Sequence, residues 1–194
     1  MINIVLFGPP GSGKGTQAQN LILRYNLKQI STGDLFRHNI KNGTPLGQLA
    51  KSYIDKGELV PDKVTVDMLV DDLVKPTDTN GFIFDGFPRT TAQAAVLDEI
   101  VREHLISEIT ICIALVVDDE ILVQRLLERG KTSGRTDDSD ESIIRNRISE
   151  YYRKTAEVAE HYKQQYKYVE IDGVGEIPEI AEKIFAAIDK VKVK

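Results

Sequence analysis

Residues 8–16, Gly8-Pro9-Pro10-Gly11-Ser12-Gly13-Lys14-Gly15-Thr16, separate an apolar run from a helical pattern. The run Ile2–Phe7 has the composition of a buried strand, and residues 17–25 have the periodicity of a helix. A strand, a glycine-rich turn and a helix can cradle phosphate, because glycines leave room for backbone N–H groups to face an anion. The helix N-terminus and Lys14 add positive charge. This stretch therefore predicts a phosphate site at the start of a parallel α/β sheet.

The spacing from Gly8 to Lys14 fits the P-loop template, but Gly15 stands where the template has Ser or Thr, and Thr16 follows one residue late. The metal ligand must therefore come from elsewhere. Asp85 directly follows the apolar run 82–84, and ligands of parallel sheets gather at the carboxyl ends of strands. We predict that Asp85 holds Mg²⁺, through bound water, although a strand-end acid can also cap a turn.

The amino-acid composition favours some classes of protein and argues against others. The 194 residues are 41% hydrophobic and 28% charged, which is typical of a soluble globular domain. A single cysteine argues against a disulfide framework and against a cysteine-rich zinc site. The net charge of −5 argues against nucleic acid as a partner, and no apolar run is long enough to span a membrane. Without a secretion-signal pattern, we expect a cytoplasmic protein.

Strand-like runs alternate with helical patterns, which predicts a parallel sheet with helices on both faces. The run 109–117 is so uniformly apolar that we expect it inside the sheet. The strand runs are residues 2–7, 28–30, 82–84, 109–117 and 168–171.

Capping residues predict where several helices begin and end. Thr44-Pro45 begins a helix that ends near Gly57, and Thr90 or Thr91 begins one that runs to Ile100. We expect three further helices. The first covers residues 120–128, capped by Asp118 or Asp119 and ended by Gly130, the second is one long helix, straight or bent, over 141–166, and the last has Pro178 in its first turn. Residues 31–60 add helices beyond a simple crossover, and 130–135 form a polar segment that we predict to be a mobile loop.

Arginines supply positive charge that an acidic phosphate-binding protein must concentrate in one place. Arg125 and Arg129 are four residues apart, so they share one helix face. So many arginines suit two nucleotides held end to end, where catalysis is mainly positioning and electrostatic stabilisation. An acceptor that is itself a phosphate is ionised at neutral pH and needs no general base. The other candidates are Arg37, Arg89, Arg135, Arg145 and Arg147.

Four motifs together resemble the short-lid form of adenylate kinase, a member of the nucleoside monophosphate kinase family. The motifs are residues 8–16, 31–34, 85–89 and 133–138, in this order along the chain. The resemblance implies Mg²⁺-dependent transfer between ATP and AMP to give two ADP, in a monomer without zinc, serving adenine nucleotide homeostasis. It also implies a P-loop NTPase-type fold with a five-stranded parallel sheet, in one domain over residues 1–194. The implied parts are a core (1–30, 61–129 and 137–194), a helical NMP-binding subdomain (31–60) and a short lid loop (130–136).

The resemblance also implies residue roles. The ATP-binding set is Gly11, Ser12, Gly13, Lys14, Gly15, Thr16, Arg129 and Gly175. The AMP-binding set is Thr32, Arg37, Glu58, Leu59, Val60, Gly86, Phe87, Pro88, Arg89, Gln93, Arg135 and Arg147. The catalytic set is Lys14, Arg89, Arg125, Arg129, Arg135 and Arg147, with Asp85 toward the metal. The segment 136–146 is one residue longer than usual, so Arg145 stays a rival to the favoured Arg147.

Two alternatives remain at this stage. A UMP/CMP kinase shares the short lid, but such enzymes tend to have Ala at the Thr32 position and Asn at the Gln93 position. The Gln93 amide offers both a donor and an acceptor to an adenine edge. A nucleotide-dependent switch or ATP-binding module is the alternative of a different class, and it would need neither an acceptor subdomain nor this many arginines.

Overall fold

Five parallel strands form one sheet in the order β2-β3-β1-β4-β5. The structure is a computed structural model that describes residues 1–155 and 157–192. The predicted five-stranded parallel sheet is confirmed, and β4 lies between two neighbours as expected for its apolar run. The strand predicted over 109–117 is shorter, because its first two residues precede the ladder. The strands are β1 (Ile2–Phe7), β2 (Lys28–Ser31), β3 (Gly81–Asp85), β4 (Ile111–Val116) and β5 (Tyr168–Asp172).

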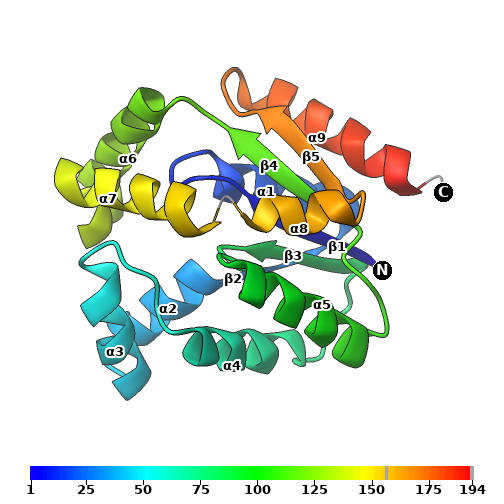
Figure 1. The fold of residues 1–194 in the computed structure, drawn as a ribbon, viewed down its shortest axis with the longest axis horizontal. Helices are drawn as coiled ribbons and strands as arrows, with labels where there is room; N and C mark the ends of the chain where they lie inside the picture. Colours follow the sequence, from blue (N-terminus) through cyan, green and yellow to red (C-terminus); the bar gives the residue numbers. More distant parts are fainter. Residues whose placement is uncertain (156, 193–194) are drawn as a thin grey trace.

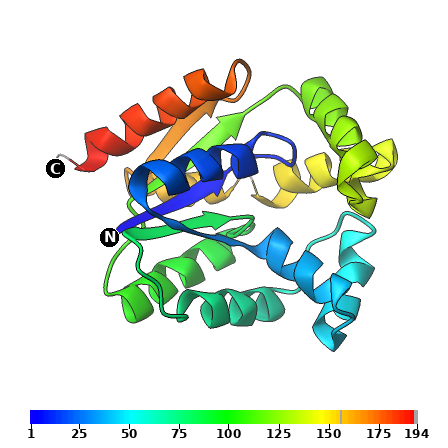
Figure 2. The same cartoon turned by 180° about the vertical axis from the view of Figure 1, so that it is seen from behind.

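Helices cover both faces of the sheet (Figures 1 and 2). On one face, α1 (Lys14–Tyr25) and α9 (Ile177–Lys192) pack Leu21 and Ile184 against the strands. On the other, α4 (Asp62–Leu73), α5 (Thr91–Leu105) and α8 (Val158–Gln164) bury a second set of apolar side chains. Burial of both faces explains why the inner strands β1, β3 and β4 are almost continuously apolar.

Two helical units stand at the carboxyl ends of the strands, on the left of Figure 1. One consists of α2 (Thr32–Lys41) and α3 (Pro45–Ile54), and it has a small core of its own around Phe36. The other pairs α6 (Asp119–Ser133) with α7 (Glu141–Glu150) through a separate apolar cluster. A short 3₁₀ turn, η1 (Thr136–Asp138), connects α6 to α7. The two units therefore flank the edge of the sheet where ligands of parallel α/β folds bind.

The helix starts agree with the capping residues, but the ends differ. Thr44 and Thr90 accept hydrogen bonds from Gly47 N and Gln93 N, as N-caps do. The helix begun at Thr44 ends at Ile54, before Gly57, and the one begun at Thr90 continues past Ile100 to Leu105.

The prediction that Gly130 ends α6 is wrong. The helix continues to Ser133 and ends at Gly134, which has a φ of 65°. Residues 130–133 of the expected lid loop are therefore helical. Gly130 serves a different purpose, since a Cβ there would lie 2.3 Å from the carbonyl oxygen of Asp138. Glycine lets η1 approach the backbone of α6 closely.

The long helix expected over 141–166 is interrupted. After α7, residues Tyr151–Thr155 form a π-helical turn, and α8 begins at Val158. Such turns often occur at functional sites. Here the turn directs Tyr151 toward the carboxyl end of β1, with its ring 5.5 Å from that of Phe7. No helix within 1–155 and 157–192 is long and apolar enough to cross a membrane.

Candidate active site

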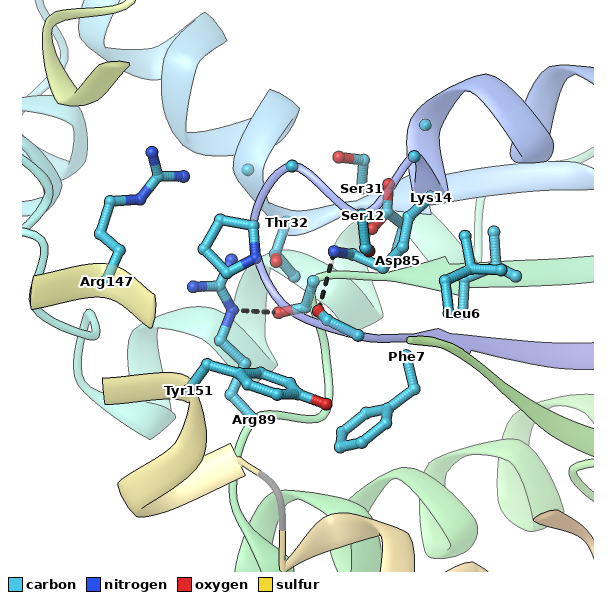
Figure 3. Close-up of a pocket in the computed structure, with 18 of the residues that line it drawn as sticks. Leu6, Phe7, Ser12, Lys14, Ser31, Thr32, Asp85, Arg89, Arg147 and Tyr151 are labelled. Atoms are coloured by element: carbon cyan, nitrogen blue, oxygen red, sulfur yellow. Dashed lines mark hydrogen bonds between the residues drawn. The ribbon is translucent and has the colours of Figure 1, made fainter. Parts of the chain in front are cut away.

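A cleft of about 710 Å³ opens at the carboxyl ends of the strands. Its walls come from the glycine loop, the α2–α3 unit, the segment after β3, and α6 and α7. Figure 3 shows Lys14, Arg89 and Arg147 around the same space, with Asp85 beside Lys14. Residues from all four sequence motifs thus meet in one place.

The glycine loop owes its shape to residues that lack a side chain. Gly8, Gly11 and Gly13 have φ values of 138°, 83° and 99°, which other residues rarely adopt. A Cβ on Gly8 would also lie 2.7 Å from the carbonyl oxygen of Leu115. The loop then enters α1 directly at Lys14, so the N-terminus of that helix faces the cleft.

Lys14 folds back across the loop. Its Nζ donates hydrogen bonds to the carbonyl oxygens of Gly8 and Pro9, at 2.9 and 3.0 Å. Burial lowers the pKa of Lys14 to about 8, and Asp85 only partly opposes this effect. Arg89 and Arg147 lower it further, because like charges disfavour one another. The crowding of cations makes this position suited to an anionic ligand.

Six of the predicted arginines line the cleft: Arg37, Arg89, Arg125, Arg129, Arg135 and Arg147. Arg89 faces the open cleft, yet the surrounding protein and the nearby Arg147 lower its pKa to about 10. Burial likewise lowers the pKa of Arg135. Five elements or loops contribute these side chains, so the fold, rather than one helix, concentrates the charge.

Arg145 and Arg147 have different surroundings. Arg145 donates to both carboxylate oxygens of Glu120 and to Glu141, at a half-exposed position outside the cleft. Arg147 is 19% exposed, lines the cleft and pairs with Asp137 and Asp138. The geometry therefore favours Arg147 for contact with a ligand.

Asp138 joins two arginines of the cleft, and sequence reasoning did not single it out. Its side chain is fully buried. Its oxygens accept from Nε and Nη2 of Arg129, at 2.6 and 3.0 Å, and from Nη1 of Arg147 at 2.6 Å. Burial alone would raise the pKa of Asp138, but these arginines lower it below its ordinary value. The only sequence signal was its place in the motif 133–138.

One wall of the cleft comes from the start of α2 and the segment after β3. Thr32 and Gln93 are each 3% exposed there, and Glu58, Leu59 and Val60 complete the wall. Gly86 has a φ of 79°, and a Cβ there would lie 2.8 Å from Thr32 Oγ1. Pro88 also lines the cleft. Phe87 does not, because its side chain is 1% exposed and packs in the sheet core.

The opposite end of the cleft reaches the loop after β5. Gly175 lines it with a φ of 129°. Arg125 Nη2 donates to the carbonyl oxygen of Gly173 at 3.1 Å, and Gln17 Nε2 donates to that of Ile177 at the same distance. Helices α6 and α1 are thus tied to the segment after β5. The remaining P-loop residues that line the cleft are Gly11, Ser12, Gly13, Gly15 and Thr16.

Asp85 lines the cleft, and its carboxylate offers hard oxygen ligands for a metal ion. Its Oδ2 accepts a hydrogen bond from Gln29 Nε2 at 3.0 Å, a contact that the sequence did not reveal. Within the described residues, no group of three or more His, Cys, Asp or Glu side chains could enclose a metal ion. A single carboxylate beside a phosphate loop fits Mg²⁺, which keeps several waters and uses few protein ligands.

The glycine loop, the sheet order and the cation-lined cleft define a P-loop nucleotide-binding protein of the α/β class. Comparison with known proteins narrows the class. The adenylate kinase family model matches residues 6–167, and the chain belongs to this family.

Relatives match over nearly the whole chain. An adenylate kinase of Flavobacterium psychrophilum is 56% identical over 98% of this chain and 100% of its own length. Those of Parabacteroides distasonis and Renibacterium salmoninarum are 47% and 45% identical, each over 99% of this chain and over 100% and 98% of their own lengths.

Proposed function

We propose that the chain transfers a phosphoryl group reversibly between ATP and AMP to give two molecules of ADP. One observation carries the proposal: the P-loop with its lysine, six arginines and the buried side chains of Thr32 and Gln93 all line one cleft. The names of the relatives support the same reaction, and they do not favour the UMP/CMP kinase alternative.

In this proposal the two nucleotides enter from opposite ends. The P-loop amides and Lys14 hold the ATP phosphates, with the ATP base near Gly175. The recess bounded by Thr32, Val60 and Gln93 takes the AMP base. The AMP phosphate then lies among Arg37, Arg89, Arg135 and Arg147, and Arg125 and Arg129 approach from the ATP side. Glu58 and Leu59 add backbone contacts, and Gly86 and Pro88 form the floor.

The chemistry follows from the charges. An oxygen of the AMP phosphate attacks the γ-phosphorus of ATP, and the bond from that phosphorus to the bridging β-oxygen breaks. The acceptor is already ionised at neutral pH, so no protein base is needed. The arginines and Lys14 stabilise the negative charge that spreads over the transferring oxygens. Their positions are fixed in advance, so little reorganisation is required.

Asp85 is the residue that we propose to face Mg²⁺ through bound water, with Gln29 holding the carboxylate in place. When bound, Mg²⁺ neutralises phosphate charge and orients the β- and γ-phosphates. The cysteine-poor composition gives no reason to involve zinc. A monomer in the cytoplasm remains a prediction.

The domain assignment is also part of the proposal: a core, an AMP-binding subdomain over 31–60, and a short lid over 130–136. Contacts between the two flanking units support it. Thr136 Oγ1 donates to Asp55 Oδ1 at 3.0 Å, and Asn146 Nδ2 donates to the carbonyl oxygen of Lys56 at 2.7 Å. These bonds bring the units together over the cleft, which would exclude water so that AMP receives the phosphoryl group.

ADP production tests the reaction directly. ATP with AMP should give ADP, while ATP alone should give little, and ATP with CMP should be a poor pair. Faster turnover with CMP than with AMP would refute the assignment, and ATP hydrolysis as fast as transfer would refute the exclusion of water.

A further inference from the structure

Gln93 is held at both ends of its amide. This residue lies in the first turn of α5 and is 3% exposed. Its Oε1 accepts a hydrogen bond from the backbone N–H of Arg89 at 2.7 Å. Its Nε2 donates to Oδ1 of Asp62 at 2.6 Å. Asp62 is the first residue of α4, and it does not itself line the cleft.

These two partners fix which way the amide points. A backbone N–H can only donate, and an ionised carboxylate can only accept. Turning the amide by 180° would place N–H against N–H and oxygen against carboxylate oxygen. Both hydrogen bonds would be lost, and the Gln93 amide, at 3% exposed, has little water to replace them, although Asp62 itself is exposed. The amide therefore has one favoured orientation, and the hydrogen bond to Asp62 is one of the two contacts that fix it.

What the amide offers a base follows from that orientation. One Oε1 lone pair and one Nε2 hydrogen are occupied, so one acceptor and one donor remain. The Watson–Crick edge of a 6-aminopurine has an acceptor at N1 and a donor at N6, while a 6-oxopurine has a donor at N1 and an acceptor at O6. A given placement of the amide matches one of these edges, and only a flipped amide matches the other.

We propose that Asp62 is a specificity-determining positioning residue: by locking the Gln93 amide together with the Arg89 N–H, it excludes 6-oxopurine monophosphates from the acceptor recess. The inference rests on the proposed function, because it assumes that this recess takes the AMP base. A 6-oxopurine would place its donor and acceptor against the like groups of the fixed amide. The hydrogen bonds to Asp62 and the Arg89 N–H would have to break before this base could pair with Gln93.

A simpler role for Asp62 makes a different prediction. An acid at the first position of a helix stabilises the N-terminal end of the dipole. In that role, its replacement would lower the stability of α4 and leave the choice between purines unchanged. The ratio of catalytic efficiencies with AMP and IMP therefore separates the two roles.

The experiment compares wild type, Asp62→Asn, Asp62→Ala and the control Asp67→Asn, an exposed acid on the same helix. The measured quantities are kcat/KM for AMP and for IMP, the KM for ATP, and the inhibition constant of IMP against AMP. Asn has nearly the shape of Asp, but its amide can turn either an acceptor or a donor toward Gln93. Asp62→Asn therefore no longer fixes the orientation of the Gln93 amide, yet it keeps a side chain of nearly the same shape.

We expect both Asp62 variants to lower the AMP-to-IMP ratio of kcat/KM about tenfold and to tighten inhibition by IMP. The KM for ATP should stay within about twofold, and Asp67→Asn should match wild type. An unchanged ratio in Asp62→Asn, or equal losses with AMP and IMP, would overturn the inference. If Asp62→Ala fails to fold, the near-isosteric Asn variant decides. A wild-type protein that makes no AMP-dependent ADP would instead refute the proposed function.

Discussion

Replacing Lys14 with Met should make the free protein more stable while it removes activity. The Lys14 ammonium is partly buried among cations, and its pKa falls from 10.5 to about 8. That difference corresponds to about 3 kcal/mol of destabilisation at neutral pH. Partial exposure and the lost bonds to Gly8 O and Pro9 O reduce the gain, so we expect about 1–2 kcal/mol. For a chain of this length, the melting temperature should rise by about 3–6 °C.

The pH dependence of stability tests whether the charge of Lys14 causes the difference between wild type and Lys14→Met. The folded pKa of Lys14 is lower than the unfolded one, so between pH 8 and 10.5 the unfolded chain holds a proton that the folded chain lacks. The stability of wild type should therefore rise toward that of Lys14→Met across this window and approach it above pH 10.5. Urea unfolding at pH 7, 9 and 10.5 measures the change, with the exposed Lys183→Met as a matched control.

Activity should move in the opposite direction. Lys14→Met should lower kcat by about 10²-fold or more, because a charge directed at the phosphates is lost in a site shielded from water. A variant less stable than wild type at pH 7, with Lys183→Met unchanged, would refute the electrostatic argument. Full activity in Lys14→Met would refute the P-loop assignment.

Three other perturbations test the arginine cluster and the metal. Asp138→Asn removes the charge of a buried partner of Arg129 and Arg147. The variant should lose about 2 kcal/mol of stability in urea unfolding, and its kcat/KM should fall at least tenfold. Unchanged kinetics would exclude a positioning role for Asp138. Arg147→Lys should reduce kcat by about 10²-fold in the ADP assay and Arg145→Lys by less than twofold; the reverse order would assign the contact to Arg145. Removal of Mg²⁺ should abolish ADP production while a zinc-selective chelator leaves it intact, and loss of activity with that chelator would contradict the metal assignment.

The sequence predicts the core of the fold well because its signals are local. Apolar runs define the strands, and Thr44, Thr90 and Asp118 mark helix starts by hydrogen bonds to residues two or three positions on. The glycine loop is equally local, since its conformation depends on residues that tolerate positive φ. Every residue of the predicted ATP-binding, AMP-binding, catalytic and metal sets except Phe87 lines the cleft, while the rival candidate Arg145 lies outside it.

The misses have a common cause in contacts between distant segments. Gly130 looked like a helix end, but its glycine is required by the backbone of Asp138, which packs against α6. Asp62, Gln29 and Asp138 act through other side chains, so their types and spacing gave no sign of their partners. Nothing in the local pattern separates a buried acid that holds arginines from an acid in solvent.

The close contact at Gly130 has a consequence for how the unit formed by α6 and α7 can move. Because η1 lies against the backbone of α6, and Asp138 bonds Arg129 of α6 and Arg147 of α7, the three segments are coupled through one buried carboxylate. While these hydrogen bonds persist, Arg129 cannot move without carrying Arg147 with it. Any rotation of the coupled segments would therefore shift both guanidinium groups at once. A substitution at Gly130 would therefore disturb both Arg129 and Arg147 in the cleft, although residue 130 itself does not line it.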